Sequence, residues 1–190
     1  MRTTRAGQSA LLLLDAVGVL AARKIRYAVI GAMAASVHGI VRASMDADAV
    51  LSLTIQETPP LEREFRAAGF QTDLRRGDPD DPIAGVLSLT DIYRNRVDLL
   101  VGLRGLDPGA FSRTVELIFH QAELRVVGLE DFIAMKVFAG GPQDLADARA
   151  AIAAAGDRLN QALAKVLARR FGRDVAETLE RLIAESSANT

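Results

Sequence analysis

Two aspartates, Asp46 and Asp48, stand one residue apart at the start of the segment DADAVLSL. Its Val and Leu residues favour a strand, in which alternate side chains share a face. The two like charges would then repel each other unless a cation or water compensates them. A third acid, Asp98, stands inside the apolar run RVDLLV, where it is less easily explained as surface decoration. If the two strands are neighbours, three carboxylates converge.

Three carboxylates offer the hard oxygen ligands that suit Mg²⁺ or the similar ion Mn²⁺. Mg²⁺ keeps several waters and usually completes its shell with substrate phosphates. Two such ions about 4 Å apart can stabilise both the entering and the leaving oxygen of a phosphoryl or nucleotidyl transfer. The competing interpretation is that Asp46 and Asp48 lie in water at the start of a strand. It would be preferred if the pair were considered alone, and the third acid, Asp98, argues against it.

The residues before the acids fit phosphate chemistry. Gly31 ends the strand-like segment YAVIG, and the Ala-rich helical segment AMAASVHG follows at once. A helix N-terminus offers unpaired N–H groups and partial positive charge, and glycine lets a ligand approach the backbone closely. Alternatively, Gly31 serves only the turn from strand to helix. Arg42 could reach a phosphate or could be solvated.

Two later helical segments carry further candidates. Lys136 shares an apolar helix face with Phe132, Ile133 and Val137, so it either reaches solvent over a buried stem or binds phosphate. Asp144 falls near the start of the next helix, where it favours the helix dipole whatever its function. Asp147 follows one turn later on the same side and is the better functional candidate of the two.

The elements that must position these residues follow from periodicity and turn signals. Strands are expected over 27–31, 46–53, 70–74, 84–91, 94–102, 114–119 and 123–127, and helices over 10–22, 32–39, 58–69, 129–140, 142–155, 158–171 and 174–186. The pattern predicts an α/β (α+β) fold. A short mixed sheet with flanking helices forms a core domain over 1–128, and a helical C-terminal subdomain covers 129–190.

Composition excludes several classes of protein. The net charge of −1 gives no bulk attraction to nucleic acid, and the absence of cysteine excludes disulfides and thiolate metal sites. Two histidines leave little material for structural zinc. Asp15 interrupts the early apolar run, which argues against a signal peptide, and no run is long enough to span a membrane. A cytoplasmic protein without membrane contact is expected.

The order of these features resembles a known family. IGAMAASVHGIVRASMDADAVLSL is similar to the signature of the nucleotidyltransferase superfamily typified by DNA polymerase beta: a strand, Gly-Gly or Gly-Ser, a short helix, then Asp-x-Asp on the next strand and a third Asp later. The residue pattern of this segment is most similar to that of small bacterial AbiEii-type and minimal nucleotidyltransferases. LEDFIAMKVFAGGPQDLADARAAI is similar to the family's Lys-containing helix and the following Asp-x-x-Asp helix. The matches cover about 27–53, 96–101 and 129–152.

The resemblance implies a role for each candidate residue. Asp46 and Asp48 would be paired metal ligands, and Asp98 would complete the metal site and help to activate the attacking hydroxyl. The backbone at Gly31 and Ala32 would hold the triphosphate of an NTP. The remaining roles are phosphate contacts for Arg42 and Lys136, and the second acidic motif for Asp144 and Asp147.

The implied activity is Mg²⁺-dependent transfer of a nucleoside monophosphate from an NTP to an acceptor hydroxyl. The resemblance suggests RNA such as tRNA, or a protein, as acceptor, and a toxin–antitoxin context with a cognate antitoxin. Ala32 replaces the family's second Gly or Ser, and Gly141 stands where relatives often have a basic residue. These departures favour an alternative, a catalytically silent nucleotidyltransferase-like binding or regulatory module. A third interpretation is a structural α/β domain whose acids face solvent.

Overall fold

The computed structural model describes residues 1–40 and 45–188, and the chain forms two compact units. The first unit comprises Met1–Met33, Ala43–Arg104 and Val115–Val126. The second comprises Ala34–Arg42, Gly105–Thr114 and Val127–Thr190. It therefore takes in the predicted helical region together with two earlier segments of the chain.

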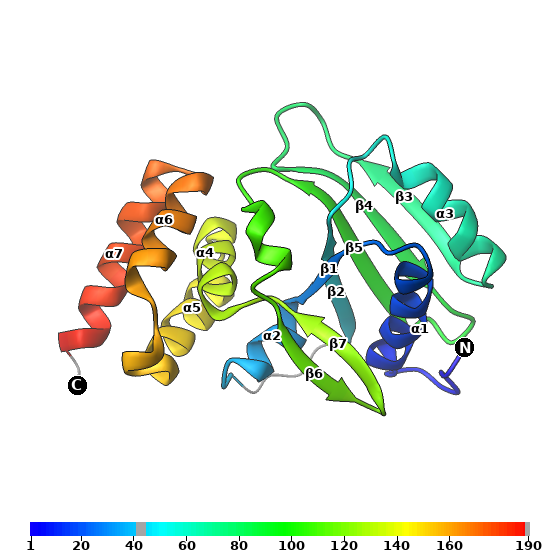
Figure 1. The fold of residues 1–190 in the computed structure, drawn as a ribbon, viewed down its shortest axis with the longest axis horizontal. Coiled ribbons are helices and arrows are strands. Elements are labelled where there is room, and N and C mark those ends of the chain that lie inside the picture. Colours follow the sequence, from blue (N-terminus) through cyan, green and yellow to red (C-terminus); the bar gives the residue numbers. More distant parts are fainter. Residues whose placement is uncertain (41–44, 189–190) are drawn as a thin grey trace. The chain divides into compact units, whose positions relative to one another are not determined.

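A mixed sheet forms the first unit, as the sequence predicts (Figure 1). Its strands are β1 Tyr27–Ile30, β2 Asp46–Leu51, β3 Gln71–Arg76, β4 Ile83–Thr90, β5 Arg96–Leu103, β6 Val115–Phe119 and β7 Ala122–Val126. Within the described residues the sheet has seven strands in the order β3-β4-β5-β2-β1-β7-β6. The β2–β5 and β1–β7 pairs are parallel, and the other neighbours are antiparallel. The expected neighbourhood of the two acid-bearing strands is confirmed.

A tight turn between β4 and β5 sets the start of the strand that carries Asp98. The Asp91 carboxylate accepts hydrogen bonds from the backbone N–H groups of Tyr93 and Asn95, at 2.8 and 2.9 Å. The Asn95 side chain donates to Asp91 and to the carbonyl of Arg5, and its Oδ1 accepts from the backbone N–H of Gln8. The local Asx-turn chemistry of DIYRN thus fixes the hairpin between β4 and β5.

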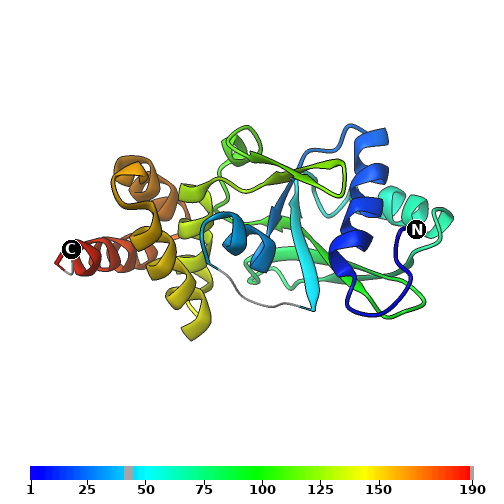
Figure 2. The same cartoon turned by 90° about the horizontal axis from the view of Figure 1, so that it is seen from below.

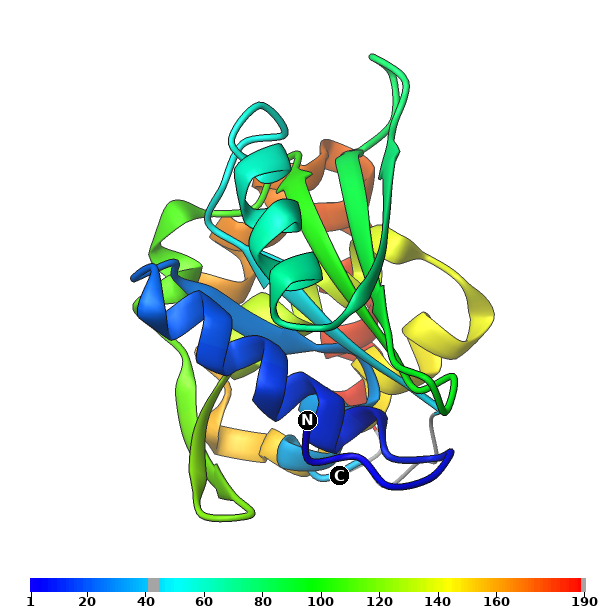
Figure 3. The ribbon, with the colours of Figure 1, turned by 90° about the vertical axis from the view of Figure 1, so that its right-hand side faces the viewer.

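Two helices of the first unit, α1 Ser9–Ala22 and α3 Thr58–Ala67, lie on the same face of the sheet (Figure 3). The apolar side chains that alternate with the acids are almost completely buried, including Ala47, Ala49, Val97 and Leu99. Because strand side chains alternate between faces, the acids lie on the opposite face of the sheet. The buried apolar face therefore holds the strands in place, and the other face carries the acids.

Among its described residues, the second unit contains the helices α4 Leu129–Ala139, α5 Pro142–Ala155, α6 Gln161–Phe171 and α7 Arg173–Ala188, and short 3₁₀ turns at Pro108–Phe111 and Gly156–Arg158. The later residues of the helix α2 Gly31–Val37 also belong to it. The helices α4 to α7 pack on one another (Figure 2). The helix α6 begins three residues later than predicted, because the Asn160 side chain caps it by accepting from the N–H of Leu163 at 3.0 Å.

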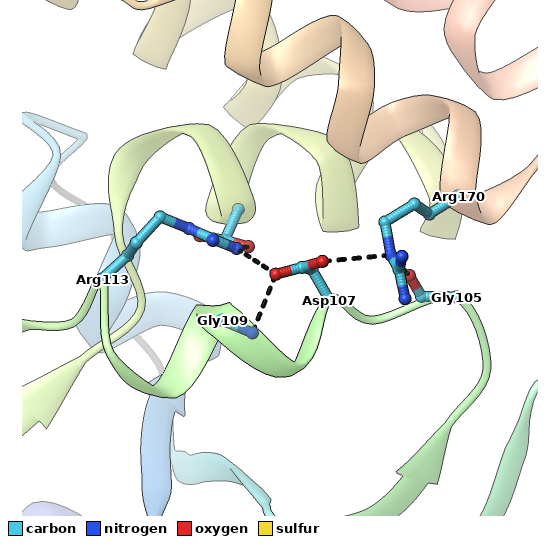
Figure 4. Close-up of polar contacts among 6 residues, drawn as sticks. Gly105, Asp107, Gly109, Arg113 and Arg170 are labelled. Carbon is cyan, nitrogen blue, oxygen red and sulfur yellow. Dashed lines mark hydrogen bonds and ion pairs between the residues drawn. The ribbon is translucent and has the colours of Figure 1, made fainter.

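A charged cluster fastens the segment 105–114 within the second unit (Figure 4). Arg113 forms a two-pronged pair with the buried Asp131, both contacts at 2.8 Å, and also donates to Asp107 at 3.0 Å. Asp107 accepts from the N–H of Gly109 and pairs with Arg170 at 3.4 Å. Burial raises the pKa of Asp107, but hydrogen bonds from Arg113 and from the Gly109 N–H outweigh it, so the pKa lies below its ordinary value.

No helix in the described part of the chain is both long enough and apolar enough to cross a membrane.

Candidate active site

The structure brings the three predicted acids to one face of the first unit's sheet. In the parallel β2–β5 register, Asp48 lies directly beside Asp98 and Asp46 lies beside Arg96. Asp46 is exposed at the strand start, whereas Asp48 and Asp98 are half-buried. On the other side of β5, Ser88 of β4 is the register partner of Asp98. The predicted juxtaposition of the acids is therefore present, although their role as metal ligands stays a prediction.

A cation, Arg96, lies among these acids. Its Nε donates to Asp98 Oδ1 and its Nη2 lies near Asp98 Oδ2, both at 2.9 Å, so both carboxylate oxygens are engaged. Nη2 also donates to the hydroxyl of Ser88 at 3.3 Å. A two-pronged guanidinium–carboxylate pair is geometrically specific and stronger than a single hydrogen bond.

All three acids act on Arg96. The hydrogen bond to Asp98 raises the pKa of Arg96, burial lowers it, and the negative charges of Asp98, Asp46 and Asp48 raise it further, so the pKa lies above its ordinary value. Sequence reasoning gave Arg96 no role. The available signal was its spacing, because a residue two positions before Asp98 on a strand shares its face.

Gly31 lies against the carboxylate of Asp48. Its φ of +65° falls in the left-handed region, which residues with a side chain rarely adopt, and an added Cβ would overlap Asp48 Oδ2. The neighbouring strand residue Ile30 is the register partner of Asp48. Gly31 therefore serves both the strand-to-helix turn and the close approach of Asp48. The triphosphate contact expected of Gly31 and the buried Ala32 stays a prediction.

The second unit holds the other motif residues together as an internal charge cluster. Lys136 Nζ lies 2.7 Å from Asp144 Oδ1 and 2.9 Å from Asp147 Oδ2, and Gln143 donates to Asp147 Oδ1 at 2.9 Å. The side chain of Lys136 is 11% exposed and that of Asp147 is 1% exposed. The ammonium of Lys136 thus pairs with both acids of the predicted second motif. Its contact with a phosphate stays a prediction.

His38 packs against other residues of the second unit. Its Nε2 lies 2.9 Å from the carbonyl oxygen of Val127, and its ring centroid is 5.1 Å from that of Phe132. Burial lowers the pKa of His38, and the hydrogen bond to Val127 only partly opposes that effect.

The carboxylates of Asp46, Asp48 and Asp98 are of the chemical type that binds a divalent metal ion. The ion pair between Arg96 and Asp98 affects how such an ion could bind. Carboxylates on adjacent strands supply the oxygen donors that Mg²⁺ or Mn²⁺ prefers. Across the described residues, however, no three His, Cys, Asp or Glu side chains are grouped so that they could hold a metal ion. Asp98 is paired with Arg96 instead. Arg42, the remaining predicted phosphate contact, lies outside the described residues.

Comparison with known proteins places the fold. No protein-family model and no curated protein matches the chain. Among solved structures, it is similar to ANT(2″)-Ia in complex with adenylyl-2″-tobramycin, with a TM-score of 0.56 and 14% identity over 94% of this chain and 97% of that one. It is also similar to an antigenic nucleotidyltransferase-like protein from Paracoccidioides brasiliensis, with a TM-score of 0.54 and 14% identity over 94% of this chain and 95% of that one. The chain therefore has the fold seen in nucleotidyltransferase structures, as its sequence predicts.

Proposed function

We propose that this chain is a nucleotidyltransferase that moves a nucleoside monophosphate from an NTP to an acceptor hydroxyl. The observation that carries the proposal is the pairing of Asp48 with Asp98 on neighbouring parallel strands, with Gly31 packed against Asp48. The similarity to nucleotidyltransferase structures over nearly the whole chain supports it.

In the proposed reaction the acceptor oxygen attacks the α-phosphorus of the NTP. A bond forms between these two atoms, and the bond from the α-phosphorus to the oxygen that bridges to the β-phosphate breaks. Pyrophosphate leaves with the electron pair of that bond. The proton of the acceptor hydroxyl passes to a carboxylate oxygen of Asp98, which acts as the general base.

Binding of the nucleotide is assigned to the remaining candidates. The carboxylates of Asp46 and Asp48 would hold Mg²⁺ or Mn²⁺, with Asp98 completing the site. When bound, such an ion stabilises the negative charge that develops on the phosphate oxygens. The phosphate contact proposed within the first unit is the backbone at Gly31 and Ala32. The phosphate contacts that the family resemblance implies for Arg42 and Lys136 stay predictions, and within the second unit Asp144 and Asp147 hold the Lys136 ammonium.

The acceptor is proposed from two sources. The resemblance to AbiEii-type proteins favours RNA such as tRNA, or a protein, in a toxin–antitoxin system with a cognate antitoxin. The structural neighbour ANT(2″)-Ia was solved in complex with adenylyl-2″-tobramycin, which adds small hydroxyl-bearing molecules to the candidates. An assay must therefore offer all three classes of acceptor.

The test is transfer of label from each of four α-labelled NTPs, with Mg²⁺ or Mn²⁺, to total RNA, to cell protein and to tobramycin. Asp48→Asn should abolish transfer, because a carboxamide cannot supply the charge that holds the ion. Asp80→Asn is the matched control, since Asp80 is an exposed acid in the turn between β3 and β4, outside the row of residues that contains Asp48 and Asp98, and it should leave transfer unchanged. Undiminished transfer by a folded Asp48→Asn protein would rule out the role of Asp48.

The second candidate function is a catalytically silent nucleotide-binding module. The engagement of both Asp98 oxygens by Arg96, together with Ala32 in the signature, favours it. A thermal-shift series combined with the label-transfer assay separates the two candidates. Both predict that Mg²⁺ with an NTP analogue raises the melting temperature more than the two ligands do separately, because a ligand specific for the folded state stabilises it. Only the enzyme also produces labelled product.

A further inference from the structure

We infer that Arg96 is a resident cation of the acid cluster formed by Asp46, Asp48 and Asp98, and that it competes with a divalent metal ion for that cluster until a nucleotide binds. The inference rests on the proposed function, because it describes how that same site is regulated. It assigns Arg96 a positioning and gating role beyond the roles expected of the acids.

Arg96 is held in place through both its side chain and its backbone. Its guanidinium contacts both oxygens of Asp98 at 2.9 Å and reaches the hydroxyl of Ser88, which is only 7% exposed. Its backbone N–H donates to the hydroxyl of Ser9 at 3.0 Å. The residue is therefore held at both ends, and its charge has a defined position on the face that carries the acids.

The positive charge of Arg96 partly balances the negative charges of the acid cluster. Arg96 offsets one of the three negative charges of Asp46, Asp48 and Asp98, so the cluster can assemble without a metal ion. Each oxygen of Asp98 retains a further lone pair, so the obstacle to metal binding is chiefly repulsion between the guanidinium and a divalent ion. The side chain of Arg96 is 38% exposed, which leaves it room to turn away from Asp98.

A nucleotide changes this balance. The triphosphate brings negative charge with the metal ion, and a guanidinium is well suited to phosphate oxygens. Breaking the ion pair between Arg96 and Asp98 would then cost less free energy, because the guanidinium could bind phosphate oxygens instead. The metal ion alone should bind weakly, and the metal ion with nucleotide should bind well. Arg96 would thus couple metal loading to the presence of substrate.

The experiment measures Mn²⁺ binding to the full chain without nucleotide, by electron paramagnetic resonance titration. Arg96→Gln removes the competing charge and should tighten Mn²⁺ binding about tenfold, equivalent to about 1.4 kcal/mol. Arg96→Lys keeps the charge and should stay within about threefold of wild type. Arg94→Gln, at an exposed position in the adjacent turn, is the matched control for loss of one positive charge and should bind like wild type.

A second readout uses stability. Mg²⁺ alone should barely change the melting temperature of the wild type but should raise that of Arg96→Gln, because the variant gains a ligand specific for its folded state. Circular dichroism checks that each variant folds. If Arg96→Gln does not fold, Ser88→Ala gives the same test, since it removes one acceptor that holds Arg96 and should tighten Mn²⁺ binding about threefold, or about 0.65 kcal/mol.

The outcomes separate this inference from the proposed function. Equal Mn²⁺ affinity in wild type and Arg96→Gln would overturn the gating role, as would equal tightening by Arg96→Lys and Arg96→Gln. Transfer activity in the same preparations would then leave the proposed function standing. Tighter Mn²⁺ binding by Arg96→Gln without any transfer by wild type would support the gate and favour the silent module. No Mn²⁺ binding by any variant would overturn the gate.

Discussion

Gly31→Ala tests whether the approach of Gly31 to Asp48 matters to the site or only to the fold. The residue has a φ of +65°, and an added Cβ would overlap the Asp48 carboxylate. Two costs follow from this substitution. One is backbone strain, and the other is displacement of a carboxylate that the proposed site needs.

The two costs differ in size and in where they appear. An L-residue in the left-handed region costs about 1–2 kcal/mol of stability. The overlap falls on the end of the Asp48 side chain, which can rotate away, so it should add little to the loss of stability. Its effect on transfer should be larger, because misplacing a reacting group by about 1 Å can cost about a hundredfold in rate.

Gly7→Ala is the matched control, because Gly7 also lies in the first unit with a φ of +78° but has nothing within 4 Å of an added Cβ. Urea denaturation should show similar losses of unfolding free energy for the two variants, about 1–2 kcal/mol each. Transfer of label from NTP should fall about a hundredfold in Gly31→Ala alone. If the two variants keep equal transfer rates, the reasoning that Gly31 positions Asp48 is wrong.

Two further predictions concern the second unit. The pKa of His38 is lowered below 6.5 in the folded state, so the unfolded chain binds more protons as the pH falls through that value. The unfolding free energy should therefore decrease as the pH is lowered through about 6.5, and urea titrations should show a smaller slope for His38→Gln than for wild type. Lys136→Met leaves the buried Asp147 without its ammonium partner and should cost about 3 kcal/mol of stability. Lys165→Met, whose pair with Glu180 is exposed, should cost no more than about 1 kcal/mol, and equal losses would contradict the importance assigned to burial.

Much of the fold could be predicted because local signals agreed with one another. Period-two alternation located the strands that carry Asp48 and Asp98, and Pro142 marked the start of α5. Strand order was harder to predict, since β2 pairs with β5 across an intervening helix and two strands. The neighbourhood of these strands was inferred from chemistry, because three acids on one face make sense only if they meet.

The limits of sequence reasoning appear at the cations. Strand parity placed Arg96 on the face of Asp98, but parity alone does not show that the guanidinium turns along the strand to engage its neighbour. Similarly, helix periodicity placed Lys136 on an apolar face and left phosphate binding and exposure to solvent as alternatives. The structure shows a third arrangement, an ion pair with Asp144 and Asp147, which depends on how α4 and α5 pack.

Arg96 in the first unit and Lys136 in the second unit therefore have the same electrostatic role, but removing them should have different effects. Each cation compensates carboxylates that would otherwise repel one another. Asp147 is 1% exposed, so removal of its cation leaves a charge that water cannot reach, and the protein should lose stability. Asp98 is 18% exposed beside the exposed Asp46, so removal of its cation leaves carboxylates that a dissolved ion can reach. Under the proposed competition, burial decides which cation is structural and which one a metal ion would replace.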